Sequence, residues 1–413
     1  MLIVFFCVLL IQGIITCVVT IDNGLELWGI DNKSAWGVTI VNFVFWIGLA
    51  HSGTLISAIL YLFHQSWRNA INRIAETMTL IAILCSCIFL LLHTGRPWFS
   101  WLWIVPYPNQ FGLWINFRSP LFWDLIAVLT YFIVSVIFWY MGMIPDLAYY
   151  RSKTKSKIKQ KLYSFFSIGW LGNARQWRSY LELYGIIAGV ATALVISVHS
   201  VVSMDFALTA LPGWHSTIFP PYFVIGAIFS GLAFVVLLIN ILRESFDIGD
   251  FVTDAHLDKL NKMIFFMSWL VLFSYLIEIF GTFFNTDYYE LALLNVKLHS
   301  KVYWIMVACN CVIPLFYISK HIRRSSVFST VISVLILVGM WLERYNIVVY
   351  SQENSIILPD TFSYSPSFME MSIFLGSIGL FGLLYMSFIK LLPLIPTWEL
   401  VFDEKKLRNN LPG

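Results

Sequence analysis

The sequence predicts an all-α integral membrane protein with about ten transmembrane helices. Ten runs of mostly apolar residues are each long enough to span a hydrocarbon core about 30 Å thick, which needs a helix of roughly 20 such residues. Of the 413 residues, 59% are hydrophobic and only 12% are charged, a balance that soluble domains of this size do not show. Helices are expected because lipid offers no partner to an unpaired backbone amide or carbonyl.

The predicted spans follow one another along the chain at residues 2–19, 41–63, 77–92, 121–143, 184–202, 219–242, 263–284, 302–318, 327–341 and 371–392. The first lacks a preceding basic region and a convincing cleavage site, so we interpret it as a retained helix rather than a signal peptide. Six cysteines lie in spans, and Cys85 with Cys87, like Cys309 with Cys311, is separated by two positions. That spacing turns side chains about 200° apart on a helix, which does not suit one metal ion. We interpret the cysteines as packing residues.

The distribution of basic residues predicts the orientation. With a cytoplasmic N-terminus, all but six of the 26 Lys and Arg residues fall on the inside, and the exceptions are Lys33, Arg96, Arg118, Lys297, Lys301 and Arg344. Basic residues concentrate on the cytoplasmic side of membrane proteins. We therefore expect a multi-pass protein of a bacterial inner membrane with both termini in the cytoplasm.

The densest basic cluster, residues 151–161, lies between spans four and five. We interpret it as an anchor at anionic headgroups of the lipid membrane, with docking of a cytoplasmic partner as the alternative. Nucleic acid is not an expected partner, because the cluster has no interleaved aromatic residues.

An internal repeat predicts the domain organisation. Residues 39–53 align without gaps on residues 217–231, which matches two glycines and a Ser-Gly pair. We predict two parallel four-helix-bundle repeats, with chance similarity between apolar helices as the alternative. The predicted units are residues 1–35 with the first helix and a periplasmic connector, residues 36–203 and 204–350 with the two bundles, and residues 351–413 with the last helix and a cytoplasmic tail.

One candidate site lies between spans three and four, where ionisable residues occur at membrane depth and default to function. His93 ends span three, Arg96 and Trp98 follow it, and Asp124 opens span four. The connection across residues 98–120 is rich in Trp and Pro, as expected of an element in the membrane interface. A base, a carboxylate and aromatic walls suit the binding and deprotonation of a quinol. The alternative is that His93 and Asp124 cap helix ends and pair with Arg96.

A second set of polar residues predicts a proton path. His199 and Asp205 lie at the outer end of span five, Ser274 and Glu278 share one face of span seven by their i, i+4 spacing, and His51 lies near the middle of span two. Chains of His, Asp and Glu serve as proton relays in pumps. The alternative is simple hydrogen bonding across helices. No pair of histidines on facing spans has the surroundings expected of a b-type haem, so we predict neither haem nor metal in this chain.

Three stretches of the chain carry a resemblance to a known family. They are residues 36–59, residues 93–98 (His-Thr-Gly-Arg-Pro-Trp) and residues 199–223. They resemble the NrfD or polysulfide reductase membrane-subunit family, and within it most closely the C subunit of bacterial alternative complex III. The resemblance implies a haem-free subunit that oxidises menaquinol near the periplasmic face and passes electrons to an iron-sulfur subunit. It also implies c-type cytochrome subunits and a paralogous, proton-translocating membrane subunit as partners, and it maps the family's quinol-site His and Asp onto His93 and Asp124.

The sequence thus predicts a quinol-binding and quinol-oxidising subunit of a respiratory electron-transfer complex, catalytic only within that complex and releasing protons to the periplasm. Rival hypotheses are the paralogous proton-translocating subunit, a structural anchor for extrinsic redox proteins, and a secondary transporter. Parallel repeats and buried acids fit a transporter, but no span shows the Gly/Pro-broken midpoint that marks a substrate site. Co-isolation of haem c, iron and quinone would favour the redox role.

Overall fold

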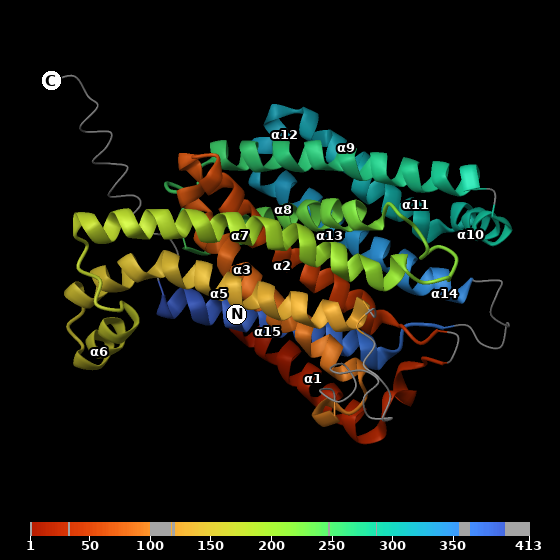
Figure 1. Ribbon diagram of the computed structural model, residues 1–413, viewed down its shortest axis with the longest axis horizontal. Coiled ribbons are helices and arrows are strands. Elements are labelled where there is room, and N and C mark those ends of the chain that lie inside the picture. The colour runs from red at the N-terminus through yellow and green to blue at the C-terminus, as the bar shows by residue number, and fades with distance from the viewer. Residues whose placement is uncertain are drawn as a thin grey trace.

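The computed structural model describes residues 2–31, 34–99, 117, 120–246, 248–285, 287–354 and 364–392. Within these residues the fold is helical, and ten helices are long and apolar enough to cross a membrane. The predicted all-α membrane fold is therefore confirmed. The long helices run side by side along the longest axis of the molecule (Figure 1).

The spanning helices are α1 (Leu2–Asn23), α2 (Val38–Leu62), α3 (Asn72–His93), α5 (Pro120–Lys153), α7 (Ala174–Ala207), α8 (Phe219–Phe246), α9 (Asp254–Asn285), α11 (Lys301–Val307) with its continuation, α13 (Ser326–Tyr345) and α15 (Phe368–Leu391). Shorter helices lie between them: α6 (Lys157–Phe166), α10 (Tyr288–His299), α12 (Lys320–Arg324) and α14 (Ser351–Glu353). Several spans are longer than the sequence predicted. α5 and α7 have 34 residues each, or about 51 Å, because they continue past the charged residues at which the hydropathy signal ends.

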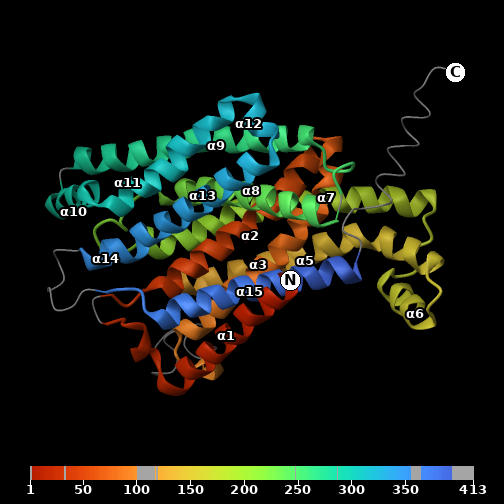
Figure 2. The same ribbon diagram turned by 180° about the vertical axis from the view of Figure 1, so that it is seen from behind.

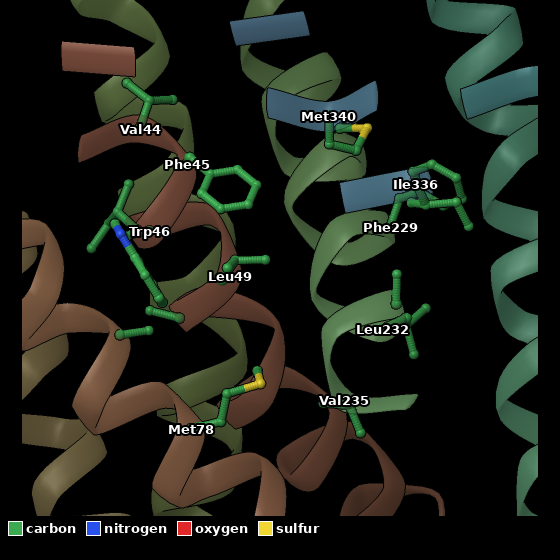
Figure 3. Close-up of a cluster of buried hydrophobic side chains, with 14 of the residues drawn as sticks. Val44, Phe45, Trp46, Leu49, Met78, Phe229, Leu232, Val235, Ile336 and Met340 are labelled. Atoms are coloured by element: carbon green, nitrogen blue, oxygen red, sulfur yellow. The ribbon is translucent and has the colours of Figure 1, made fainter. Parts of the chain in front are cut away.

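Helix α2 lies at the centre of the fold and is almost wholly buried. It packs against α3 and α7 on one side and against α8 on the other. Figure 3 shows its Trp46 and Leu49 in one apolar cluster with Leu232 of α8 and Met340 of α13. The two halves of the chain thus share one core, and their division into two repeats stays a prediction.

Two glycines matched by the repeat permit the closest approaches of α2. A Cβ at Gly53 would lie 2.2 Å from the carbonyl oxygen of Ala75 on α3. A Cβ at Gly231 of α8 would lie 1.5 Å from Oγ of Ser52 on α2. The matched positions therefore serve different contacts, one within the first half and one between the halves.

Helices α1 and α15 lie together at the edge of the bundle (Figure 2). Their contact is a glycine seam, in which a Cβ at Gly13 would lie 2.5 Å from Cα of Gly376 and one at Gly379 would lie 2.6 Å from N of Leu10. Small residues let helix backbones approach closely in membranes. Most of α1 otherwise faces outward.

The eighth span is broken, contrary to the prediction that no span has an interrupted midpoint. Helix α11 passes into a π-helical segment, Ala308–Val312, and then a 3-10 segment, Ile313–Ile318. Pro314 explains the break, because its ring lacks an N–H and clashes with the carbonyl four residues earlier, at Asn310. π-helical segments occur frequently at functional sites.

Candidate functional site

Three ionisable side chains meet at the outer ends of α3, α5 and α7. His93 is the last residue of α3, Asp124 lies in the second turn of α5, and Asp205 lies in the last turn of α7. The two carboxylates are buried, with exposed fractions of 4% and 9%, and they are close enough for their charges to interact. The sequence placed Asp205 in a proton path, whereas the structure associates it with Asp124.

Each of these residues carries a polar atom left without a partner. Nδ1 of His93, Oδ1 of Asp124 and Oδ1 of Asp205 are buried and have no hydrogen-bond partner among the residues that the structure describes. Buried polar groups in proteins are almost always hydrogen-bonded. A ligand with hydroxyl or carbonyl oxygens would satisfy these atoms, since carboxylates accept hydrogen bonds and an imidazole can donate or accept.

Arg96 and Trp98 lie at the rim of this cluster. Both side chains are exposed, Trp98 with an exposed fraction of 56%. Within the described part of the chain, Arg96 forms no ion pair with Asp124, so the alternative in which these two residues pair is not observed. The aromatic connection predicted as a lid lies largely outside the described residues, from 100 to 116.

His51 is not alone in its span, as the sequence suggested, because it contacts His199. The two Nδ1 atoms are 3.1 Å apart, and both side chains are fully buried between α2 and α7. Tyr131 of α5 stacks on the other side of His51, with ring centroids 4.5 Å apart. The two imidazoles are in direct contact, with centroids at 4.8 Å, which leaves no space for a porphyrin between them.

A second buried cluster, which the sequence did not predict, lies beside this histidine pair. Tyr275 of α9 donates to the carboxylate of Glu343 on α13, and Asn310 of the π-helical segment donates to Tyr275 Oη at 2.8 Å. Arg344 donates to Glu343 at 2.9 Å, and its charge reaches His199. The predicted ninth span ended at residue 341, so Arg344 was assigned to an outside loop, whereas both side chains are buried.

Polar groups also lead from His51 toward the inner ends of the helices. Tyr131 and Thr79 both donate to the carbonyl of Ala50. Farther inward, Ser57 and Tyr184 donate to the buried carboxylate of Glu76. The predicted third span began at residue 77, one position after this acid, so the sequence missed it.

At the inner ends of the helices, the first half holds a buried ion pair. Nη2 of Arg73 on α3 lies 2.9 Å from Oδ2 of Asp146 on α5, and the same nitrogen donates to the carbonyl of Gly142. The histidine pair, the Glu343 cluster, Glu76 and this ion pair together place buried polar groups at several depths of the described bundle.

The remaining predicted path residues lie apart from the histidine pair. Ser274 donates only to the carbonyl of Leu270 on its own helix. Glu278 contacts Lys297 of α10, with 3.6 Å between Oε1 and Nζ, in an outer cavity of about 700 Å³ that Glu290 also lines. Burial raises the pKa of the Glu290 carboxyl. Of the five residues predicted to form a path, only His51 and His199 touch.

Comparisons with known proteins extend along most of the chain. The family model described as "Polysulphide reductase, NrfD" matches residues 27–354. The C subunit of a selenate reductase of Mesobacillus selenatarsenatis is 23% identical, over 96% of this chain and 93% of the relative. A "Putative dimethyl sulfoxide reductase membrane subunit" of Halobacterium salinarum is 25% identical, over 94% and 89%. The "Hdr-like menaquinol oxidoreductase integral membrane subunit" of Archaeoglobus fulgidus is 20% identical, over 91% and 89%.

Proposed function

The chain belongs to the NrfD polysulphide reductase family, and from that premise we propose that it is the quinol-oxidising membrane subunit of a respiratory electron-transfer complex. The observation that carries the proposal is the cluster of His93, Asp124 and Asp205, whose unpaired buried atoms suit the hydroxyl groups of a quinol. The printed names of the relatives support a reductase or menaquinol oxidoreductase complex, and one of them supports menaquinol as the substrate.

In the proposed reaction the chain handles protons while a partner takes electrons. Oxidation of a quinol to a quinone releases two protons and two electrons. His93 and the carboxylates of Asp124 and Asp205 are bases placed to accept the protons and pass them to the outer face. The described residues contain no group of three or more His, Cys, Asp or Glu side chains that could hold a metal. We propose that the electrons pass to an iron-sulfur subunit bound at the outer face.

The kind of complex is a finer proposal. Residues 93–98 and 199–223 support the C subunit of an alternative complex III, with c-type cytochrome subunits and a paralogous membrane subunit as partners. The relatives' names support instead a complex built around a terminal reductase. Purification separates the two, because haem c should accompany the first kind of complex together with iron and quinone.

Substitution of the proposed bases tests the function. Asp124→Asn and His93→Ala should each lower quinol oxidation by the assembled complex at least about tenfold, as expected for loss of a general base. Asp250→Asn, which changes an exposed acid, is the control and should leave the rate unchanged. Wild-type turnover by a correctly assembled double variant would show that neither residue handles quinol protons.

Proton translocation is a second candidate function of the same chain. It is favoured by the buried polar groups at successive depths: Glu76, the pair of His51 with His199, and the cluster of Arg344 with Glu343. Proton relays in membrane proteins are built from such residues. The charges of Glu343 and Glu278 also interact, which connects this series to the outer cavity. The break at Pro314 removes the sequence argument against a transporter, but the relatives' names support the redox role.

A further inference from the structure

The short helix α6 carries an apolar face that no described residue covers. Its residues Ile158, Leu162, Phe165 and Phe166 recur at helical spacing, so they point to one side. Their exposed fractions are 75%, 52%, 77% and 45%. Ile168, which follows the helix, adds a further exposed apolar side chain at 67%.

Basic residues border this apolar face. Lys157 and Lys161 lie along one edge and Lys159 along the other, and all three are exposed. Lys153 and Lys155 precede the helix and are exposed as well. A helix with an apolar face between lysine borders has the pattern of a helix that lies in a membrane interface.

The helix is held against the side of α5 by its opposite face. Tyr163 packs near Tyr150, with ring centroids 6.4 Å apart. Tyr140 donates to the carbonyl of Phe166 at 2.7 Å. Arg151 donates to Ser167 Oγ and to the carbonyl of Trp170, which clamps the chain after α6. The apolar face is therefore turned away from the protein.

The anchor at Tyr140 sets the depth of α6. Tyr140 lies 20 residues after the outer start of α5 at Pro120, which is about 30 Å along the helix axis. That length matches the hydrocarbon core of a bilayer, about 30 Å. The end of α6 is thus fixed at the inner boundary of the hydrocarbon, at the opposite end of the molecule from α10 and on the periphery of the bundle (Figure 1).

We propose that α6 is an interfacial helix that binds the anionic phospholipids of the inner leaflet. Its phenylalanines, Leu162 and Ile158 insert among the acyl chains, and its lysines contact the phosphates. Charge complementarity and depth both support lipid as the occupant. The inference rests on the depth and orientation of the helices and is independent of quinol oxidation.

The test places a fluorescent label on each face of α6 in the full-length chain, with the six native cysteines replaced. Phe165→Cys lies on the apolar face, and Gln160→Cys on the polar face is the matched control. In vesicles containing brominated phospholipid, the label at residue 165 should lose most of its fluorescence and the label at residue 160 should keep it. Leu162→Cys provides a second apolar position should the first variant fold poorly.

Three results would overturn the proposal. They are equal quenching at residues 160 and 165, quenching of residue 165 by aqueous iodide but not by brominated lipid, and shielding of residue 165 from both quenchers only in the intact complex. The last would identify a protein partner instead.

The lysines are tested by comparing brominated phosphatidylglycerol with brominated phosphatidylcholine. Lys157→Gln should reduce the preference for the anionic lipid by up to about fivefold, since a lysine near an anionic surface contributes about that factor. Glu182→Gln, an exposed acid on α7, is the control and should not reduce it. An unchanged preference after Lys157, Lys159 and Lys161 are all replaced by Gln would contradict headgroup binding.

Discussion

Single residues decide what this membrane protein can do, because each buried charge needs a local partner. Glu343 has Arg344 and Tyr275, Glu76 has Ser57 and Tyr184, and these groups fill their hydrogen bonds inside the bundle. His93, Asp124 and Asp205 differ, since each keeps an unpaired buried atom. That contrast separates structural polar groups from candidates for substrate contact.

Glu278 is the residue that distinguishes proton movement from quinol oxidation. It lies on α9, whereas His93 and Asp124 lie on α3 and α5. Glu278→Gln should therefore reduce the protons moved per electron in liposomes and leave quinol oxidation in detergent mostly intact. Glu290→Gln, in the same cavity, is the matched control and should change neither.

Two outcomes would contradict this division of roles. An unchanged proton-to-electron ratio would show that Glu278 only supports helix packing through Lys297. Loss of quinol oxidation in detergent would place Glu278 within the quinol site.

The sequence predicted part of the candidate site because its residues lie at helix ends in a single stretch. His93 and Asp124 flank one connection and were found together. Glu76 and Glu343 were missed because a charged residue normally marks the end of a hydropathic run, and here each acid lies just past a predicted boundary with its partners on other helices. The contact between His51 and His199 depends on how α2 packs against α7, which the residue pattern does not encode.

At the scale of elements, close helix crossings hold the two halves of the chain together. The repeat predicted glycines at these crossings, but it could not show that Gly53 faces α3 while Gly231 faces α2. The break after α11 follows from Pro314, a visible signal that the sequence reading underweighted. The ten spans themselves were predictable, because the bilayer fixes their length and composition.

The crossing of α2 and α8 is tested by a substitution and its compensation. Gly231→Ala should lower the free energy of unfolding by about 1–3 kcal/mol through overpacking, because the new Cβ would overlap Ser52. The double variant Ser52→Gly with Gly231→Ala should recover much of this loss. Thermal unfolding of the purified protein measures both.

Gly281→Ala is the control for this experiment, since a Cβ there meets nothing within 4 Å. Wild-type stability of Gly231→Ala, or a double variant no more stable than the single one, would contradict the crossing.

At the scale of the whole molecule, orientation determines which face carries the quinol site. We infer a bacterial inner-membrane location with both termini in the cytoplasm, supported by the distribution of Lys and Arg. Three basic residues used in that count, Arg73, Lys297 and Arg344, are in fact buried in the helical bundle. The remaining bias still favours the same orientation, because the exposed cluster at residues 151–161 lies at the inner ends of α5 and α6.

A reporter protein tests the orientation without any activity assay. Fused within residues 153–161 it should be cytoplasmic, and fused within residues 106–109 it should be periplasmic. Reversed results would put the proposed quinol site on the cytoplasmic face and would undo the proposed route of protons and electrons.

The location of the quinol site is the central claim, and photolabelling of the intact complex with an azido-quinone tests it most directly. We predict label on peptides from the outer ends of α3, α5 and α7, around His93, Asp124 and Asp205, with the label displaced by excess quinone. Displaceable label confined to the inner ends of the helices, or to the apolar groove between α8 and α15, would contradict the account.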